Sequence, residues 1–161
     1  MKMELIQPFI NAADAVLAQN LQGATSMQDL TMEAHAYRRK GIAAVVDMQG
    51  EIEGRVIFDL EPATASQMAS FIAGGETPEA AMVDEAVCEL ANQVIGNAVT
   101  TLNDQGFRFK VLPPHVHRSD EGLAGNVDTE ALVLCFETVS GKVYLNIAMR
   151  HNLRRRQDGR R

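Results

Sequence analysis

An internal repeat constrains the fold of this 161-residue chain more than any other feature of its sequence. Residues 54–60 (GRVIFDL) and 141–147 (GKVYLNI) share one pattern, 87 positions apart. Residues 4–10 (ELIQPFI) and 89–95 (ELANQVI) echo each other at a similar separation of 85 positions. Chance similarity remains an alternative, because strand segments with a period of two often resemble one another. A true repeat would mean that two copies of one supersecondary unit build the chain.

Hydrophobic periodicity and turn residues predict the elements of this unit. Two β-hairpins are expected, from 42–48 with 51–60 and from 132–138 with 143–149. The other expected elements are a helix from Pro8 to Gly23, a strand that begins at Asp29 and reaches Ala36, a short helix over 62–73, a long helix with Thr77 as its N-cap that runs to Leu102, a strand over 107–112 and a polar loop over 118–130. We therefore expect an α+β fold in which duplicated α-β-β-β units form a mostly antiparallel sheet with long helices packed on one face.

Composition sets the class of protein. A chain of this length with 46% hydrophobic residues buries enough surface to fold as one domain without a disulfide or a structural metal. The two cysteines lack the spacing of a disulfide framework or a CxxC site. No apolar run approaches the roughly 20 residues of a membrane-spanning helix, and the N-terminal segment lacks a secretory signal pattern. These features predict a cytoplasmic protein.

The net charge of −6 is the sum over two unlike parts. Residues 150–161 hold six Arg and one Asp, whereas residues 1–149 hold 9 basic and 20 acidic residues. The acidic part would repel phosphate backbones, which argues against nucleic acid as the main partner. We expect a domain over 4–149 and a flexible Arg-rich tail over 150–161.

The long helix carries the candidate chemistry. At about 100° per residue, Glu85, Glu89, Asn92 and Gly96 fall on the face opposite its apolar stripe. Glycine inside a helix costs about 1 kcal/mol relative to alanine, so either another element or a partner must approach the backbone at Gly96. An exposed carboxylate can pair with a partner's lysine, and an amide can orient a water for in-line attack on a phosphoryl group. Glu-x-x-Asn also occurs on many solvated helices, so its spacing alone leaves the choice open.

Residues 84–98 (DEAVCELANQVIGNA) resemble the signature helix of the CheC/CheX family of chemotaxis phosphatases. That signature has Glu-x-x-Asn, a Gly four residues after the Asn, and a Pro about two dozen residues downstream. Pro113 and Pro114 follow Asn92 by 21 and 22 residues. Residues 4–10 also look like the start of CheX-type chains, so the resemblance covers about 4–149. One departure is Glu85, where the family often has Asp or Ser.

The resemblance implies a phosphatase that accelerates hydrolysis of the aspartyl phosphate of a CheY-like response regulator. Glu89 would bind the regulator's lysine, Asn92 would position the attacking water, and Glu85 and Gly96 would contact the partner. Mg²⁺ would be supplied by the bound regulator, so no metal site and no cofactor are expected in this chain. Family members are similar in forming dimers through their sheets, which implies a homodimer.

The first repeat suggests a second copy of the site at Glu4 and Gln7. Because a residue before proline favours an extended backbone, Pro8 predicts that Glu4 and Gln7 precede the helix and do not share a face. We therefore expect one site per chain.

Other readings stay open. A non-catalytic scaffold that binds response regulators or belongs to the flagellar switch would share the fold, and the Arg-rich tail could serve an unrelated partner. His115 and His117 have the spacing of a metal pair but no third ligand nearby, which favours a solvated loop. Cys88, at the margin of the core face, is expected to be a small apolar filler.

Overall fold

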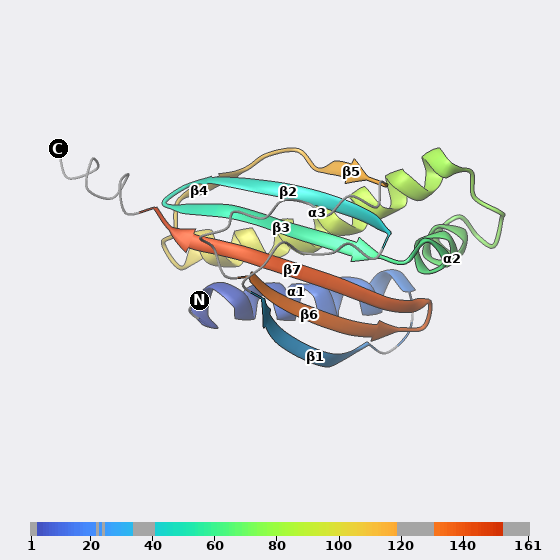
Figure 1. Ribbon diagram of the computed structural model, residues 1–161, viewed down its shortest axis with the longest axis horizontal. Coiled ribbons are helices and arrows are strands. Elements are labelled where there is room, and N and C mark those ends of the chain that lie inside the picture. Colours follow the sequence, from blue (N-terminus) through green and yellow to red (C-terminus); the bar gives the residue numbers. More distant parts are fainter. Residues whose placement is uncertain (1–2, 22, 24, 34–40, 119–130, 153–161) are drawn as a thin grey trace.

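The computed structural model describes residues 3–21, 23, 25–33, 41–118 and 131–152, and Figure 1 shows their arrangement. The elements in chain order are α1 (Met3–Leu21), β1 (Ser26–Glu33), β2 (Ile42–Gly50), β3 (Ile52–Leu60), α2 (Pro62–Ile72), α3 (Ala80–Asp104), β4 (Phe109–Val111), β5 (His115–His117), β6 (Ala131–Thr138) and β7 (Gly141–His151). Both expected hairpins are present, as β2–β3 and β6–β7.

The strands form one sheet in the order β1-β6-β7-β3-β2-β4, and β5 also pairs with β2. Every pair is antiparallel. Phe58 in β3 and Leu145 in β7 are direct partners, and they are also the equivalent residues of the repeat, 87 positions apart. A pseudo-two-fold axis therefore passes between β3 and β7 at the centre of the sheet. The expected fold of duplicated α-β-β-β units is confirmed.

All three helices cover the same face of the sheet. The helices α1 and α3 pack side by side across the strands, and α2 lies at one end (Figure 1). Strand β2 shows the two faces clearly, because Ala44 and Val46 join the main core under the helices. Its neighbours Ala43 and Val45 join a small separate cluster with Ile57 and Val133 on the opposite face. The period-two pattern of the sequence thus sorts the side chains into a helix-covered layer and a second layer.

The first helix begins earlier than the sequence predicts. It starts at Met3, so Pro8 lies inside it and not at its first position. Proline removes the hydrogen bond that its nitrogen would donate to the Glu4 carbonyl, and its ring crowds that carbonyl, at a cost of about 3 kcal/mol. The burial of Leu5, Ile6 and Phe9 outweighs that loss, because this turn supplies apolar surface to the core.

The long helix begins later than predicted. Thr77 is not its N-cap, since α3 starts at Ala80 and Glu79 occupies the cap position without a side-chain hydrogen bond to the backbone. The first buried residue of α3 is Val83. An additional N-terminal turn would therefore bury no apolar side chain, and a favourable capping sequence alone does not extend the helix.

Residues 115–117 form strand β5, where the sequence predicted a solvated loop. They pair with residues 43–45 of β2, whose backbone groups would otherwise lie at the edge of the sheet. Val116 packs against the core, and this contact stabilises the pairing of β5 with β2. The two prolines before it separate β5 from β4, because proline has no N–H to donate to the ladder.

Two ends of the predicted elements also differ. Strand β1 begins at Ser26, and the predicted continuation over 34–36 lies outside the described residues. Strand β7 runs to His151, and the Arg150 Nε donates to Glu53 Oε1 at 2.9 Å, so the expected tail overlaps a strand at its start. The rest of that tail, 153–161, and most of the expected polar loop lie outside the described residues. Within the described part of the chain, no helix is long and apolar enough to cross a membrane.

Candidate functional site

The solvent-facing side of α3 lies where the sequence places it. The helix buries one stripe of residues, which consists of Val83, Val87, Leu90, Ala91, Val94, Ile95, Ala98 and Leu102. Glu85, Glu89, Asn92 and Gly96 are all exposed on the other side, and together they are called the exposed α3 face below. A carboxylate and an amide one helical turn apart therefore reach solvent from a rigid element, as the 3.6-residue period requires.

Gly96 leaves open space above the helix backbone. Outside the backbone of α3 itself, a Cβ added at Gly96 would meet no atom of the described residues within 4 Å, so no other described element requires glycine here. Of the two explanations that the sequence allows, close packing inside the fold finds no support among the described residues. Access by a partner to the helix backbone stays a prediction.

Glu89 is held by a hydrogen-bonded neighbour. The Gln93 Nε2 donates to Glu89 Oε1 at 3.1 Å, and the Asn20 Nδ2 of α1 donates to Gln93 Oε1 at 2.9 Å. Asn20 Nδ2 also donates to the backbone carbonyl of Val16 at 2.8 Å. Among the described residues, none hydrogen-bonds the Asn92 side chain. The Asn92 amide therefore faces solvent without a described hydrogen-bond partner, whereas Glu89 is oriented by Gln93.

The N-terminal end of α3 is tied to strand β5. Arg118 follows β5 and forms an ion pair with Asp84 on α3, and its Nη2 also donates to the Ala80 carbonyl at 3.0 Å. Both partners of the ion pair are well exposed, so the pair contributes at most about 1 kcal/mol to stability. Its position nevertheless places one cation beside the acidic start of the exposed α3 face.

Cys88 lies half-buried on α3 next to these residues. Burial raises the pKa of the Cys88 thiol, and the negative charge of Asp84 raises it further. A raised pKa disfavours the thiolate, which is the nucleophilic form. The thiol therefore lacks the environment of a catalytic nucleophile.

Within the described residues, no group of three or more His, Cys, Asp or Glu side chains comes close enough to hold an ion. His115 is exposed and His117 half-buried on β5, and neither gains a third ligand from that part of the chain.

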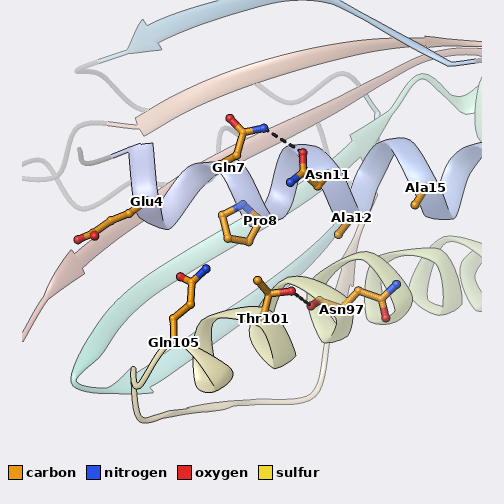
Figure 2. Close-up of a pocket in the computed structure, with 9 residues that line it drawn as sticks. All are labelled: Glu4, Gln7, Pro8, Asn11, Ala12, Ala15, Asn97, Thr101 and Gln105. Carbon is orange, nitrogen blue, oxygen red and sulfur yellow. Dashed lines mark hydrogen bonds between the residues drawn. The ribbon is translucent and has the colours of Figure 1, made fainter.

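The first repeat forms a polar groove, and the prediction that Glu4 and Gln7 do not share a face is wrong. Both residues lie on one side of α1, because the helix includes them despite Pro8. Together with Asn11 they line a cavity of about 380 Å³ between the start of α1 and the end of α3 (Figure 2). The lining residues are Glu4, Gln7, Pro8, Asn11, Ala12, Ala15, Asn97, Thr101 and Gln105.

The two repeats nevertheless differ where it matters. Gln7 Nε2 donates to Asn11 Oδ1 at 2.9 Å, so its amide is tied along the helix, as Figure 2 shows. Asn11 is the repeat equivalent of Gly96, and its side chain stands where the exposed α3 face has bare backbone. The groove thus has the carboxylate and an amide but lacks the open approach.

Comparison with known proteins gives this arrangement a family. Residues 42–137 match the model of the chemotaxis phosphatase CheX. The fold and the matched range define a chemotaxis protein of the CheC-like class. The chain belongs to the CheX family. A comparison with curated protein sequences gave no match.

Three solved structures show how far the likeness extends. A CheC-like superfamily protein from Shewanella sp. PV-4 superposes with a TM-score of 0.82 at 21% identity, over 93% of this chain and 99% of that one. CheX of Borrelia burgdorferi, in a complex with CheY, BeF₃ and Mg²⁺, gives a TM-score of 0.70 at 31% identity, over 91% and 97% of the two chains. FliY of Thermotoga maritima gives 0.68 at 18% identity, over 87% and 84%.

Sequence reasoning missed Gln93 and Asn20. Gln93 follows Glu89 by four positions, and the pairing of helical neighbours at that spacing could have suggested the contact. Asn20 is 73 positions away on another helix. No local signal points to it, because the contact exists only once α1 and α3 are packed.

Proposed function

We propose that this protein accelerates hydrolysis of the aspartyl phosphate of a CheY-like response regulator. The observation that carries the proposal is the exposed α3 face, on which Glu89 and the exposed Asn92 amide lie about two turns and one turn before the bare backbone at Gly96. Membership of the CheX family supports it, and so does the similar Borrelia protein, which was solved in complex with CheY.

In the proposed mechanism the exposed α3 face docks on the phosphorylated aspartate of the regulator. The Glu89 carboxylate pairs with a lysine of the regulator and fixes the register of the two proteins. Glu85, one turn earlier, extends the negative potential toward the same basic surface. Gly96 lets the regulator backbone approach the helix, which a larger side chain would prevent.

Asn92 supplies the positioning. Its carbonyl oxygen accepts a hydrogen bond from a water and holds the water in line with the phosphorus, where catalysis depends on geometry and electrostatics. The water oxygen bonds to phosphorus as the bond to the aspartyl oxygen breaks, and the water proton leaves with the phosphate. Mg²⁺ belongs to the regulator's acidic pocket in this proposal and is treated as part of the substrate.

The proposal is tested with a phosphorylated response regulator and Mg²⁺, by following phosphate release. The wild-type protein should accelerate release above the regulator's own rate. Asn92→Ala should lower the stimulated rate about 100-fold, because the water loses its orientation. Asn103→Ala, an exposed amide near the C-terminal end of the same helix, is the matched control and should keep full activity.

Two results would contradict the mechanism. Full activity of folded Asn92→Ala would remove the amide from the reaction. Tight regulator binding by a wild-type protein that releases no phosphate would instead favour the non-catalytic scaffold. Homodimerisation and a cytoplasmic location remain predictions.

A further inference from the structure

Two hydrogen bonds link Glu89 to α1 in a fixed direction, and together they are called the amide relay below. They lead from α1 to the solvent side of α3, through Asn20 and Gln93. Asn20 and Gln93 are half-buried in the seam between the helices, whereas Glu89 is exposed. The amide relay therefore begins in the half-buried seam between the helices and ends at the exposed carboxylate that is proposed to bind the partner's lysine.

The direction of the amide relay is fixed at Asn20, its half-buried end on α1. The Val16 carbonyl can only accept, so Asn20 must turn its NH₂ group toward it. The second hydrogen of that NH₂ group goes to Gln93 Oε1. With its oxygen committed to Asn20, Gln93 must present its own NH₂ group to Glu89. A reversed Gln93 amide would place an oxygen against the carboxylate, where both groups only accept.

We infer that Gln93 is a positioning residue for the Glu89 carboxylate, and that Asn20 sets the orientation of the Gln93 amide. The inference rests on the proposed function, because it assigns a use to the orientation of Glu89. A free glutamate side chain samples several rotamers and loses that freedom when it docks. A carboxylate already held by Gln93 loses less, so the regulator binds more tightly without any additional contact.

Among the described residues of the first repeat, the amide relay has no equivalent. Pro8 is the repeat equivalent of Gln93, and it has no side-chain donor to offer to Glu4. Gln105 is the equivalent of Asn20, and it lines the groove near Pro8 (Figure 2). The amide relay is thus present in one repeat only, the one that carries the exposed α3 face.

The experiment separates positioning from stability by means of the half-saturating regulator concentration and the maximal rate. Gln93→Ala should raise the half-saturating concentration about three- to tenfold, the cost of ordering one free glutamate side chain on binding. The maximal rate should change less than twofold. A merely structural defect would lower the maximal rate and the unfolding temperature and leave the half-saturating concentration unchanged.

Substitutions of Asn20 test the direction of the amide relay. Asn20→Ala leaves Gln93 able to donate to Glu89 and should have only a small effect. Asn20→Asp replaces the donor by an acceptor, so Gln93 turns its NH₂ group to Asp and its oxygen to Glu89. Its effect should therefore match or exceed that of Gln93→Ala, although residue 20 does not contact Glu89. In a Gln93→Ala background, Asn20→Asp should add nothing.

Matched controls carry the same chemical changes elsewhere. Asn103→Asp on α3 repeats the change made at residue 20, and Gln67→Glu on α2 is matched with Gln93→Glu, which removes the donor at residue 93. Gln93→Glu should raise the half-saturating concentration, and the two controls Asn103→Asp and Gln67→Glu should leave it unchanged. Equal effects of Asn20→Ala and Asn20→Asp, or an effect of Asn20→Asp that persists without Gln93, would overturn the inference.

A measurement without turnover keeps the inference apart from the proposed function. The side-chain NH₂ resonances of Gln93 should shift in both Glu89→Ala and Asn20→Asp, and stay in place in Asn103→Asp. Unchanged resonances in the first two variants would exclude the relay. A wild-type protein that shows this coupling but no phosphate release would overturn the proposed function and leave the relay standing.

Discussion

At Gly96 the stability of a helix and access to its surface make opposite demands. Glycine weakens α3, and no other described element lies near enough to require it. We predict that Gly96→Ala raises the free energy of unfolding by up to about 1 kcal/mol. This corresponds to an increase of about 2–4 °C in unfolding temperature for a chain of this size. Thermal unfolding followed by circular dichroism measures it.

The same substitution should impair docking. The added methyl group stands between the helix backbone and the regulator, and overpacking of this kind costs about 1–3 kcal/mol. The half-saturating regulator concentration should therefore rise about tenfold or more. A Gly96→Ala protein that is more stable and equally active would show that the partner does not approach the helix here.

At the scale of elements, the sheet depends on a close approach of β3 and β7 at Gly54. Its φ is +140°, and a Cβ added there would lie 1.9 Å from the Ala148 carbonyl oxygen. We predict that Gly54→Ala lowers the free energy of unfolding by about 2–5 kcal/mol, from backbone strain together with the clash. Urea denaturation provides the value.

A second glycine separates strain from the clash. Gly74, after α2, also has a positive φ of +81°, but a Cβ there would meet nothing within 4 Å. Gly74→Ala should cost only about 1–2 kcal/mol, the strain alone. Equal losses of unfolding free energy in the two variants would mean that the clash with β7 adds nothing to the cost of a side chain at Gly54.

The elements themselves show what the sequence can predict. Both hairpins follow from local patterns, because their register depends on adjacent segments and a tight turn. The start of α1 was not predictable from Pro8, since the burial of the residues around it decides the outcome. Strand β5 was missed for the same reason: a three-residue run becomes a strand only when β2 offers it an edge.

The candidate site divides in the same way. The exposed α3 face could be predicted because helical geometry alone sorts Glu89, Asn92 and Gly96 to one side. The relay through Asn20 could not be predicted, since it depends on how two helices distant in sequence pack. Local rules thus locate the groups that face solvent, and tertiary packing decides which of them are held in place.

At the scale of the whole molecule, the two repeats exchange strands. Strand β1 of the first half pairs with β6 of the second, and β4 and β5 of the second half pair with β2 of the first. The halves also meet at the centre, where β3 pairs with β7. Each half alone would therefore keep one hairpin and lose the partners of its remaining strands.

This exchange predicts that neither half folds as a monomer. Fragments 1–75 and 76–161 should each lack a cooperative unfolding transition, because the apolar face of each hairpin loses half of its cover. Mixed in equal amounts, the two fragments should restore the circular dichroism spectrum and the amide NMR spectrum of the intact chain. A protein cut after folding, at the exposed Gly74-Gly75 link, is the control and should keep its fold. A monomeric fragment 1–75 with dispersed amide resonances and cooperative unfolding would show that the first repeat is an independent unit, and that strand exchange does not hold this fold together.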